Sequence, residues 1–368
     1  MFYLKLYDKN HSLKDNCDIH LFSNLQYTKT LNGVNSLSFN VPVNYLKQNE
    51  IKINLNDDIE LYIVENNIES CIWWGKVINP TNTSIDEISI VCEGYFSCLF
   101  NRIQKHLYDN FASTGNKDYL EETYSNVGYG ELILSLIGTQ NYYDFTGVSQ
   151  GVNKDYSKLK TTRIIAWDDL LDQKISEFIE ASGLYFEIDQ DKKFNIYSSY
   201  GEDKSEYYII QDGNLLSCSQ NIIDYSKIIN QVYALNNFTE EQEDGTQVDR
   251  YVTYIAEDKE SIALYGLKQE VLTVNDLREQ ETIKSYAEQE LSKVSCPTVS
   301  IILNCTITDE LNIYSINTGD YISVDSKLLG LKGKYQVLEY TVNLATQTVE
   351  ISLGNCLYRN NQVKQYRY

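Results

Sequence analysis

Short stretches in which apolar and polar residues alternate are the feature that most constrains the fold of this chain. In SLSFNVPV, Leu37, Phe39 and Val41 alternate with polar residues or proline. Successive strand residues point to opposite faces, so this pattern is typical of a sheet with one buried face. Similar stretches fill residues 1–105 and recur over 296–355. Many short strands at this spacing predict small β-barrels or sandwiches, and the 31 tyrosines also favour β structure.

Residues 57–77 predict a β-hairpin whose second strand carries two adjacent tryptophans. Its turn is Glu65-Asn66-Asn67, and these residue types favour tight turns. Alternation places Trp74 and Lys76 on the outer face. The inward face then holds Trp73, Cys71, Gly75 and Val77. Because indoles are enriched at interfaces, Trp74 and Lys76 form a candidate subunit interface; the alternative is that Trp74 packs beneath a loop of its own chain.

A helix followed directly by a hairpin is the clearest pattern in the middle of the chain. Helical spacing links four apolar residues, Trp167, Leu171, Ile175 and Phe178. Gly183 is placed to end this helix. The hairpin strands are expected near 184–188 and 193–198. A shorter helix is expected earlier, in GELILSLIG.

A second long helix is predicted over about 275–293. Asn275 can cap it, and Pro297 follows its end. Its buried stripe consists of Ile283, Ala287, Leu291 and Val294. Beyond it, TGDYISVD and GKYQVLEYTVN loosely repeat NDDIELYIV and CIWWGKVINPTN. This faint echo indicates two similar barrels.

The predicted fold class is α+β, mainly β, with two small β-barrels and an intervening helix-plus-sheet domain. Four parts are expected: 1–105 as the first β-barrel, 106–215 with about 239–295 as an α+β middle region, about 216–238 with 296–355 as the second β-barrel, and 356–368 as a C-terminal tail. The tail contains three basic residues, Arg359, Lys364 and Arg367, and no acidic residue. The tail is either a docking segment for a partner or a frayed terminus.

Charge and cysteine content exclude some classes of protein. The net charge is −21, from 31 basic and 52 acidic residues, whereas a nucleic-acid binder needs a basic footprint. The eight cysteines are scattered without a CxxC pair and are expected to be reduced. Because no signal peptide and no bilayer-spanning apolar run is found, we expect a soluble protein made in the cytoplasm.

No catalytic, metal or cofactor site is predicted, and we expect no enzymatic activity. The three histidines, His11, His20 and His106, have no metal-binding spacing. The sequence VGYGE at 127–131 lacks the third glycine of a dinucleotide-binding loop. No two carboxylates can be argued to share a buried site, as catalysis of cell-wall cleavage commonly requires.

The order of these segments resembles the phage tail hub family, which includes the baseplate hubs and tail-associated proteins of tailed phages and of phage-tail-like bacteriocins. The likeness begins with LNGVNSLSFNVP, the tryptophan hairpin and CEGYFSCLFNRI. It continues with LLDQKISEFIEASGLYFEIDQDKKFNIYS, IINQVYALNN, ESIALYGLKQE and the closing strands TGDYISVD and GKYQVLEYTVNLATQTVEISLGN. It therefore covers residues 1 to about 355.

The resemblance implies a structural protein of the virion tail. In this family a homotrimer joins the tail tube to a spike or fibre, and two similar barrels per subunit match a sixfold tube. The implied partners are the tail tube or distal tail protein, the tape measure protein and a spike or fibre protein. DNA would pass through the ring without specific binding. No cofactor is implied, and no membrane binding by this chain alone.

Two other functions remain open from the sequence. Many relatives continue into a fibre, a peptidase or a lysozyme module, whereas this sequence stops soon after its last expected strand. We therefore expect any wall hydrolysis on a different polypeptide. A tail-associated cell-wall hydrolase with an unrecognised site is nevertheless the first alternative. A carbohydrate-binding tail-tip adhesin is the second, because tyrosine and tryptophan suit stacking on sugars.

Overall fold

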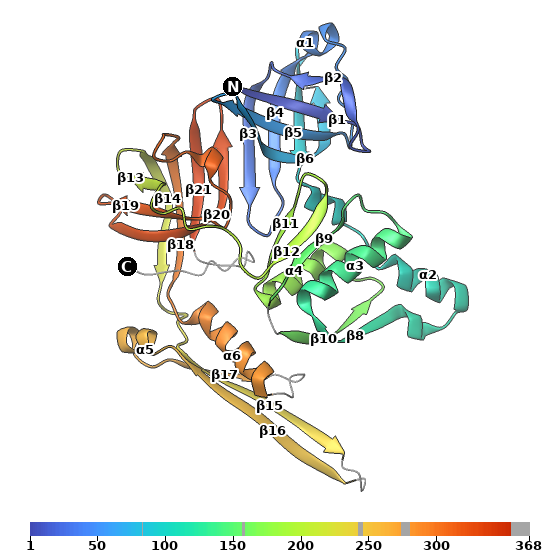
Figure 1. Cartoon of the computed structure of the whole chain (residues 1–368), viewed down its shortest axis with the longest axis vertical. Coiled ribbons are helices and arrows are strands. Elements are labelled where there is room, and N and C mark those ends of the chain that lie inside the picture. The colour runs from blue at the N-terminus through green and yellow to red at the C-terminus, as the bar shows by residue number, and fades with distance from the viewer. Residues whose placement is uncertain (83, 157–158, 242–245, 274–279, 355–368) are drawn as a thin grey trace.

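The chain folds into two β lobes, a central α+β unit and a long arm (Figure 1). The computed structural model describes residues 1–82, 84–156, 159–241, 246–273 and 280–354. We name the parts the first lobe (residues 1–93), the central unit (94–208), the second lobe (209–224 and 295–354) and the arm (225–294). The two lobes lie side by side, and the arm extends away from the second lobe.

The first lobe is a single antiparallel sheet. Its strands are β1 (Phe2–Tyr7), β2 (Leu13–Ile19), β3 (Ser23–Thr30), β4 (Ser36–Pro42), β5 (Asp58–Glu65), β6 (Ile68–Asn82) and β7 (Glu87–Glu93), with helix α1 (Val43–Gln48) between β4 and β5. They pair in the order β3-β4-β7-β6-β5-β1-β2. Asn66 and Asn67 both have positive φ, 51° and 62°, as a two-residue hairpin turn requires. The predicted tryptophan hairpin is confirmed.

The second lobe repeats this arrangement. Its strands are β13 (Ile209–Gln211), β14 (Leu215–Asp224), β18 (Thr298–Thr306), β19 (Tyr321–Ser326), β20 (Leu331–Asn343) and β21 (Thr348–Gly354). They pair in the order β14-β18-β21-β20-β19-β13, and only the β13–β19 pair is parallel among them. The order β3-β4-β7-β6-β5 of the first lobe therefore has a counterpart, strand by strand, in β14-β18-β21-β20-β19.

The two lobes are joined by the edges of β3 and β20. The first part of β20 pairs with β19, whereas Glu339–Asn343 pairs with Gln26–Thr30 of β3. The mainly β α+β class is thereby confirmed, but the prediction of two closed barrels is wrong: the strands that the structure describes pair along one open path. The reason is that the free edge of β3 pairs with the other lobe and not with β2.

A β-bulge at Ile72 decides which residues of the tryptophan strand are buried. Leu61 pairs with Trp73 and Tyr62 with Cys71, so Ile72 is an extra residue in the ladder. Trp73 is 1% exposed, as its inward orientation predicts. The bulge, however, turns Cys71 to the opposite face, so the expectation that it shares the face of Trp73 is wrong.

The central unit packs helices against short sheets. Its elements are α2 (Lys105–Thr114), β8 (Glu121–Gly128), α3 (Tyr129–Tyr143), β9 (Ser149–Lys154), β10 (Lys160–Ala166), α4 (Leu171–Ser182), β11 (Tyr185–Ile188) and β12 (Lys193–Tyr197). The expected helices are present as α3 and α4. Helix α4 begins at Leu171, after Trp167, and ends at Gly183, which adopts φ 74°. The predicted hairpin is the β11–β12 pair.

The arm is a long hairpin covered by one helix. It consists of β15 (Gln231–Glu241), β16 (Gln247–Glu257), α5 (Lys259–Tyr265), β17 (Gln269–Thr273) and α6 (Gln280–Val294). Of the expected stripe residues, Ile283, Ala287 and Leu291 are buried against β15 and β16, whereas Val294 is only half-buried. Asn275, the expected cap, lies outside the described residues. The sequence grouped 216–238 with the second barrel; in the structure β14 pairs with β18, whereas β15 belongs to the arm.

Membrane insertion by a helix finds no support in the fold. Within the residues that the structure describes, no helix is both long enough and apolar enough to span a bilayer.

Trp73 is the largest of the fully buried side chains, so its removal tests the first-lobe core. We expect Trp73→Ala to lower the free energy of unfolding by about 3–5 kcal/mol, the usual cost of deleting a buried aromatic ring. Urea denaturation followed by circular dichroism measures this. Ile85→Ala is the matched control, because its side chain is 94% exposed, and it should leave the midpoint unchanged. Equal losses for the two variants would contradict the burial.

Candidate functional site

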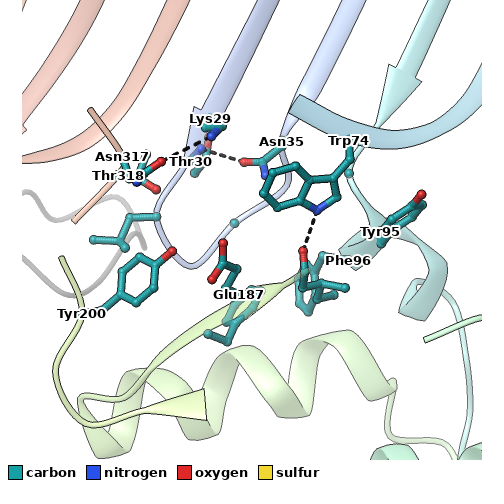
Figure 2. Close-up of a pocket in the computed structure, with 15 residues that line it drawn as sticks. Lys29, Thr30, Asn35, Trp74, Tyr95, Phe96, Glu187, Tyr200, Asn317 and Thr318 are labelled. Atoms are coloured by element: carbon teal, nitrogen blue, oxygen red, sulfur yellow. Dashed lines mark hydrogen bonds between the residues drawn. The ribbon is translucent and has the colours of Figure 1, made fainter. Parts of the chain in front are cut away.

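The best-defined polar site of the molecule is the junction where the β11–β12 hairpin meets the first lobe. Trp74 Nε1 donates a hydrogen bond to the carbonyl oxygen of Ile188 at 2.8 Å (Figure 2). At the turn of the same hairpin, Lys192 Nζ lies 2.5 Å from Asp58 Oδ2. One β-hairpin of the central unit is thus held at both its strand and its turn by the first lobe.

Asp58 is the buried charge of this junction. Its side chain is 2% exposed, and it also contacts His11 Nδ1 at 3.0 Å. Burial raises the pKa of Asp58, and the hydrogen bonds and charges of Lys192 and His11 act in the opposite direction. The ammonium of Lys192 also lies 5.0 Å from the ring centre of Tyr95, within cation–π range. Lys192 therefore has an ionic and an aromatic partner in the first lobe and the segment that follows it.

A second contact of the junction comes from the loop between β3 and β4. Asn32 Nδ2 donates to the carbonyl oxygen of Leu184 at 3.1 Å, and the backbone N–H of Phe186 donates to Asn32 Oδ1 at 2.9 Å. The side-chain amide thus pairs with the backbone of β11 as a neighbouring strand would. Asn32 has φ 52°, a conformation that asparagine tolerates better than most residues.

A small cavity of about 50 Å³ lies between the first lobe, the central unit and the second lobe. Lys29 Nζ lies 5.4 Å from the ring of Trp74 and donates to Asn317 Oδ1 at 3.5 Å, at the limit for a hydrogen bond (Figure 2). Burial lowers the pKa of Lys29 and raises the pKa of Glu187. The cavity is too small for a drug-sized ligand, for which pockets are about 300–1,000 Å³. The residues that line it therefore contribute to the contact between the parts of the chain.

Two turns that match bond for bond flank this junction, one in each lobe. In the first lobe, the N–H of Asn54 donates to Asp57 Oδ2 at 2.6 Å; in the second, the N–H of Asn317 donates to Asp320 Oδ2 at 2.7 Å. Both aspartates are almost fully buried. Each forms an ion pair with a lysine, Lys14 for Asp57 and Lys204 for Asp320.

The backbone of the two turns is held in the same way. Asn56 N–H donates to Val77 O at 2.8 Å, and Gly319 N–H donates to Val337 O at 2.7 Å. Both donors have positive φ, 66° and 94°, which explains asparagine at one site and glycine at the other. Val77 and Val337 in turn each begin a β-bulge in their strand. The faint echo in the sequence is thus a true structural repeat.

The predicted site residues have different outcomes. Trp74 lies at the junction, half-buried against the central unit, and its role in a subunit interface stays a prediction. Lys76 is half-buried and stands opposite Asp58 on β5 and Glu93 on β7. Arg359, Lys364 and Arg367 lie outside the described residues. The sequence missed Lys192, Asn32 and Asp58, because their partners are distant in the chain.

The chemistry of the described residues is that of structural contacts. His106 Nε2 lies 3.2 Å from Glu122, and His11 contacts Asp58. No group of three potential metal ligands is found in this part of the chain. The seven cysteines that the structure describes are free thiols, as expected. Burial raises the pKa of Cys71 to about 12, which keeps that thiol protonated and unreactive.

The fold is that of tail proteins encoded by prophages. The chain is similar to the crystal structures of the 43 kDa tail protein of prophage MuSo2 from Shewanella oneidensis (11% identity, TM-score 0.58, covering 96% of this chain and 97% of that chain) and of prophage tail protein gp18 from Listeria monocytogenes EGD-e (13%, 0.60, 96% and 94%). It is also similar to the tail protein from Neisseria meningitidis MC58 (10%, 0.56, 96% and 96%). At these identities the likeness concerns the fold.

The second half of the sequence is similar to a known protein family. The family model described as "Prophage endopeptidase tail" matches residues 203–361. A comparison with curated proteins finds no match. The match to the family model covers less than half of the chain, and it confirms the resemblance to phage tail proteins for that part of the sequence.

Removal of Lys192 tests the electrostatic part of the junction. We expect Lys192→Met to lower the free energy of unfolding by about 3–5 kcal/mol, because it leaves the carboxylate of Asp58 buried without its ammonium partner. Lys193→Met is the matched control: the Lys193 side chain is 50% exposed and its partner Asp191 73%, so stability should hardly change. Adding Asp58→Asn to Lys192→Met should recover part of the loss, and no recovery would contradict the pairing. Denaturant titration measures all four proteins.

The two matching turns predict matching energetic costs. Asp57→Ala and Asp320→Ala should each destabilise the chain by about 1.5–3 kcal/mol, since each removes a buried charged acceptor of a backbone N–H. Asp325→Ala, at a side chain that is 43% exposed, serves as the control. Thermal unfolding with native-state hydrogen exchange shows in which lobe each change acts. A loss confined to one of the two turns would argue against their equivalence.

Proposed function

We propose that this chain is the structural hub of a phage tail or phage-tail-like particle. Three copies form a ring that joins the tail tube to the spike or fibre and lines the channel for the tape measure protein and DNA. The chain then resides in the virion tail after its synthesis in the host cytoplasm. Its partners are its own copies, the tail tube or distal tail protein, the tape measure protein and a spike or fibre protein.

The repeat of the two lobes is the observation that carries this proposal. The five strands β3, β4, β7, β6 and β5 have counterparts in β14, β18, β21, β20 and β19, and the turns before β5 and β19 match bond for bond. A trimer of such a chain presents six similar lobes around one axis. A ring of this kind can match a sixfold tube on one side and a threefold spike on the other.

The contacts at the junction support a mechanical role for this chain. The central unit is attached to the first lobe through Trp74, Asn32 and the Lys192–Asp58 pair. Paired buried groups favour one relative orientation of the parts they join. The net charge of −21 suits a channel through which DNA slides, because the acidic chain and the DNA phosphates carry charges of the same sign and repel each other.

A tail-associated cell-wall hydrolase is the second candidate, since the matching family model is described as an endopeptidase tail. We propose that the chain acts without enzymatic activity. His11 and His106 contact carboxylates, and the thiol of Cys71 donates to the backbone carbonyl oxygen of Trp73; none of these contacts pairs a nucleophile with a base.

Two measurements test the proposal together. Native mass spectrometry of the purified chain at high concentration should give three times the mass of the 42.5 kDa monomer. Zymography on peptidoglycan should give no clearing. Clearing that is lost on substituting one carboxylate would overturn the structural proposal in favour of the hydrolase. A strictly monomeric chain that is also absent from purified tails would exclude the hub.

A further inference from the structure

We propose that the central unit carries a carbohydrate site, a shallow cavity between α3 and β9 that takes one neutral pyranose unit of a polysaccharide. The cavity has a volume of about 400 Å³ and is lined by Ser135, Gly138, Thr139, Tyr142, Tyr143 and Gln150. This activity goes beyond the structural hub, because the site lies within a single chain and needs no second copy. Helix α3 lies beside α2, on the side of the central unit that faces away from the second lobe (Figure 1).

Five of the six lining residues form one face of α3. Ser135, Thr139 and Tyr143 follow one another at intervals of four residues, and so do Gly138 and Tyr142. This spacing places side chains next to one another along a helix. Other residues of α3 are buried in the core of the central unit. Because that core fixes the helix, the cavity face is held in one orientation towards the solvent.

The floor of the cavity depends on Gly138 and Gln150. The side-chain amide of Gln150, on β9, lies against the helix, and a Cβ at position 138 would stand 2.5 Å from its Nε2. Glycine therefore leaves room for the amide, which donates to the carbonyl oxygen of Leu134 at 2.5 Å. That bond uses one N–H. In the part of the chain that the structure describes, the second N–H and Oε1 of Gln150 have no partner, so both are available to a ligand.

Two tyrosines form the aromatic wall of the cavity. Tyr142 is 84% exposed, and its ring meets that of Tyr143 edge-on, with 5.1 Å between the ring centres. The ring of Tyr143 in turn lies 5.8 Å from that of His106, a buried residue on α2. These ring contacts hold Tyr142 in place, although most of its surface is in water. Its ring is therefore both oriented and accessible.

The loop that leads from α3 to β9 is fixed by Asn141. Its Nδ2 donates to the carbonyl oxygen of Val148 at 2.5 Å, and its Oδ1 accepts from the N–H and the hydroxyl of Thr146, each at 2.9 Å. An ion pair between Arg102 and Asp144, at 2.5 Å, ties the same loop to the segment before α2. The end of α3 and the start of β9 thus keep one relative position. A preformed cavity binds with a smaller loss of conformational entropy.

The lining fits a neutral sugar better than a charged ligand. None of the six residues is charged, although the chain carries 52 acidic and 31 basic residues. Carboxylates and phosphates are commonly bound by arginine or lysine. The C–H groups of a pyranose, in contrast, carry a small positive charge and stack on the negative face of an aromatic ring such as Tyr142. The sugar hydroxyls can then exchange hydrogen bonds with the amide of Gln150 and the hydroxyl of Thr139.

The open shape of the cavity favours a unit within a polysaccharide over a free monosaccharide. The six lining residues come from only two elements, α3 and β9, so the cavity covers one side of a sugar ring. The neighbouring sugars of a polymer can then extend into solvent on both sides. The expected occupant is therefore one residue of a surface polysaccharide.

Saturation-transfer NMR on the full chain tests the site with the methyl glycosides of glucose, galactose, rhamnose and N-acetylglucosamine. We expect at least one of them to bind with a Kd on the order of 1 mM, as a shallow site with few contacts allows. Tyr142→Ala should weaken this binding about tenfold, the scale of one aromatic contact, whereas Tyr142→Phe should stay within about twofold of the parent because it keeps the ring. The matched control is Tyr207→Ala, at a tyrosine that is 73% exposed and outside the cavity, and it should bind like the parent.

A second variant and a second set of probes sharpen the test. Thr139→Val keeps the shape of the side chain and removes its hydroxyl, so it should weaken binding about threefold, the scale of one hydrogen bond. Maltotriose and chitotriose should bind at least as tightly as the methyl glycosides of glucose and N-acetylglucosamine, respectively. Circular dichroism checks that every variant is folded.

The outcomes separate the sugar site from the hub. The absence of binding by all four glycosides and both trisaccharides overturns the carbohydrate site. Binding that survives Tyr142→Ala places the sugar elsewhere and overturns it too, and an equal loss in Tyr142→Phe overturns the stacking. Glycosides that bind while the trisaccharides are excluded overturn the assignment to a polysaccharide. A chain that binds sugar through Tyr142 but stays monomeric supports the site and contradicts the hub alone.

Discussion

The antiparallel pairing of β3 with β20 is the contact on which the rest of the architecture depends. It aligns the two lobes, and it continues past the ladder, where the N–H of Leu31 donates to Leu338 O at 2.9 Å. The loop that begins at Leu31 carries Asn32, which pairs with the backbone of β11. One ladder therefore sets the positions of both lobes and of the central unit, and a shift of its register would displace all three.

The junction between the first lobe and the central unit is held by polar contacts, although apolar packing could also join two such parts. Lys192 and Asp58 form an ion pair in which the carboxylate is nearly inaccessible to water, and such pairs add little net stability compared with apolar packing. Such a pair does, however, destabilise every relative orientation of the two parts in which one charged group is buried without the other. Together with the directed hydrogen bond from Trp74, this indicates a joint selected for geometry. That property suits the hub that we propose above.

The local sequence pattern predicted the strands and helices of this chain better than it predicted whether the sheets close into barrels. The alternation around Phe39, the helix ending at Gly183 and the Asn66-Asn67 turn were all recognisable, because each is decided by neighbouring residues. The bulge at Ile72 was not, since it depends on how β5 and β6 fit, and it moved Cys71 to the other face. The closed barrels failed for a similar reason: β3 has a better partner in β20, more than 300 residues away in the chain. The pairing of Lys192 with Asp58 likewise leaves no local signal.

An exposed strand edge is a hazard, because it can pair with any other chain. The end of β6 limits this hazard through Pro80, which withholds one N–H from an incoming strand, and the net charge of −21 opposes non-specific association of copies. An encounter between copies is then productive only where several contacts form at once. The pairing of β3 with β20 removes the same hazard for two further strand edges, because their backbone groups find partners within the chain.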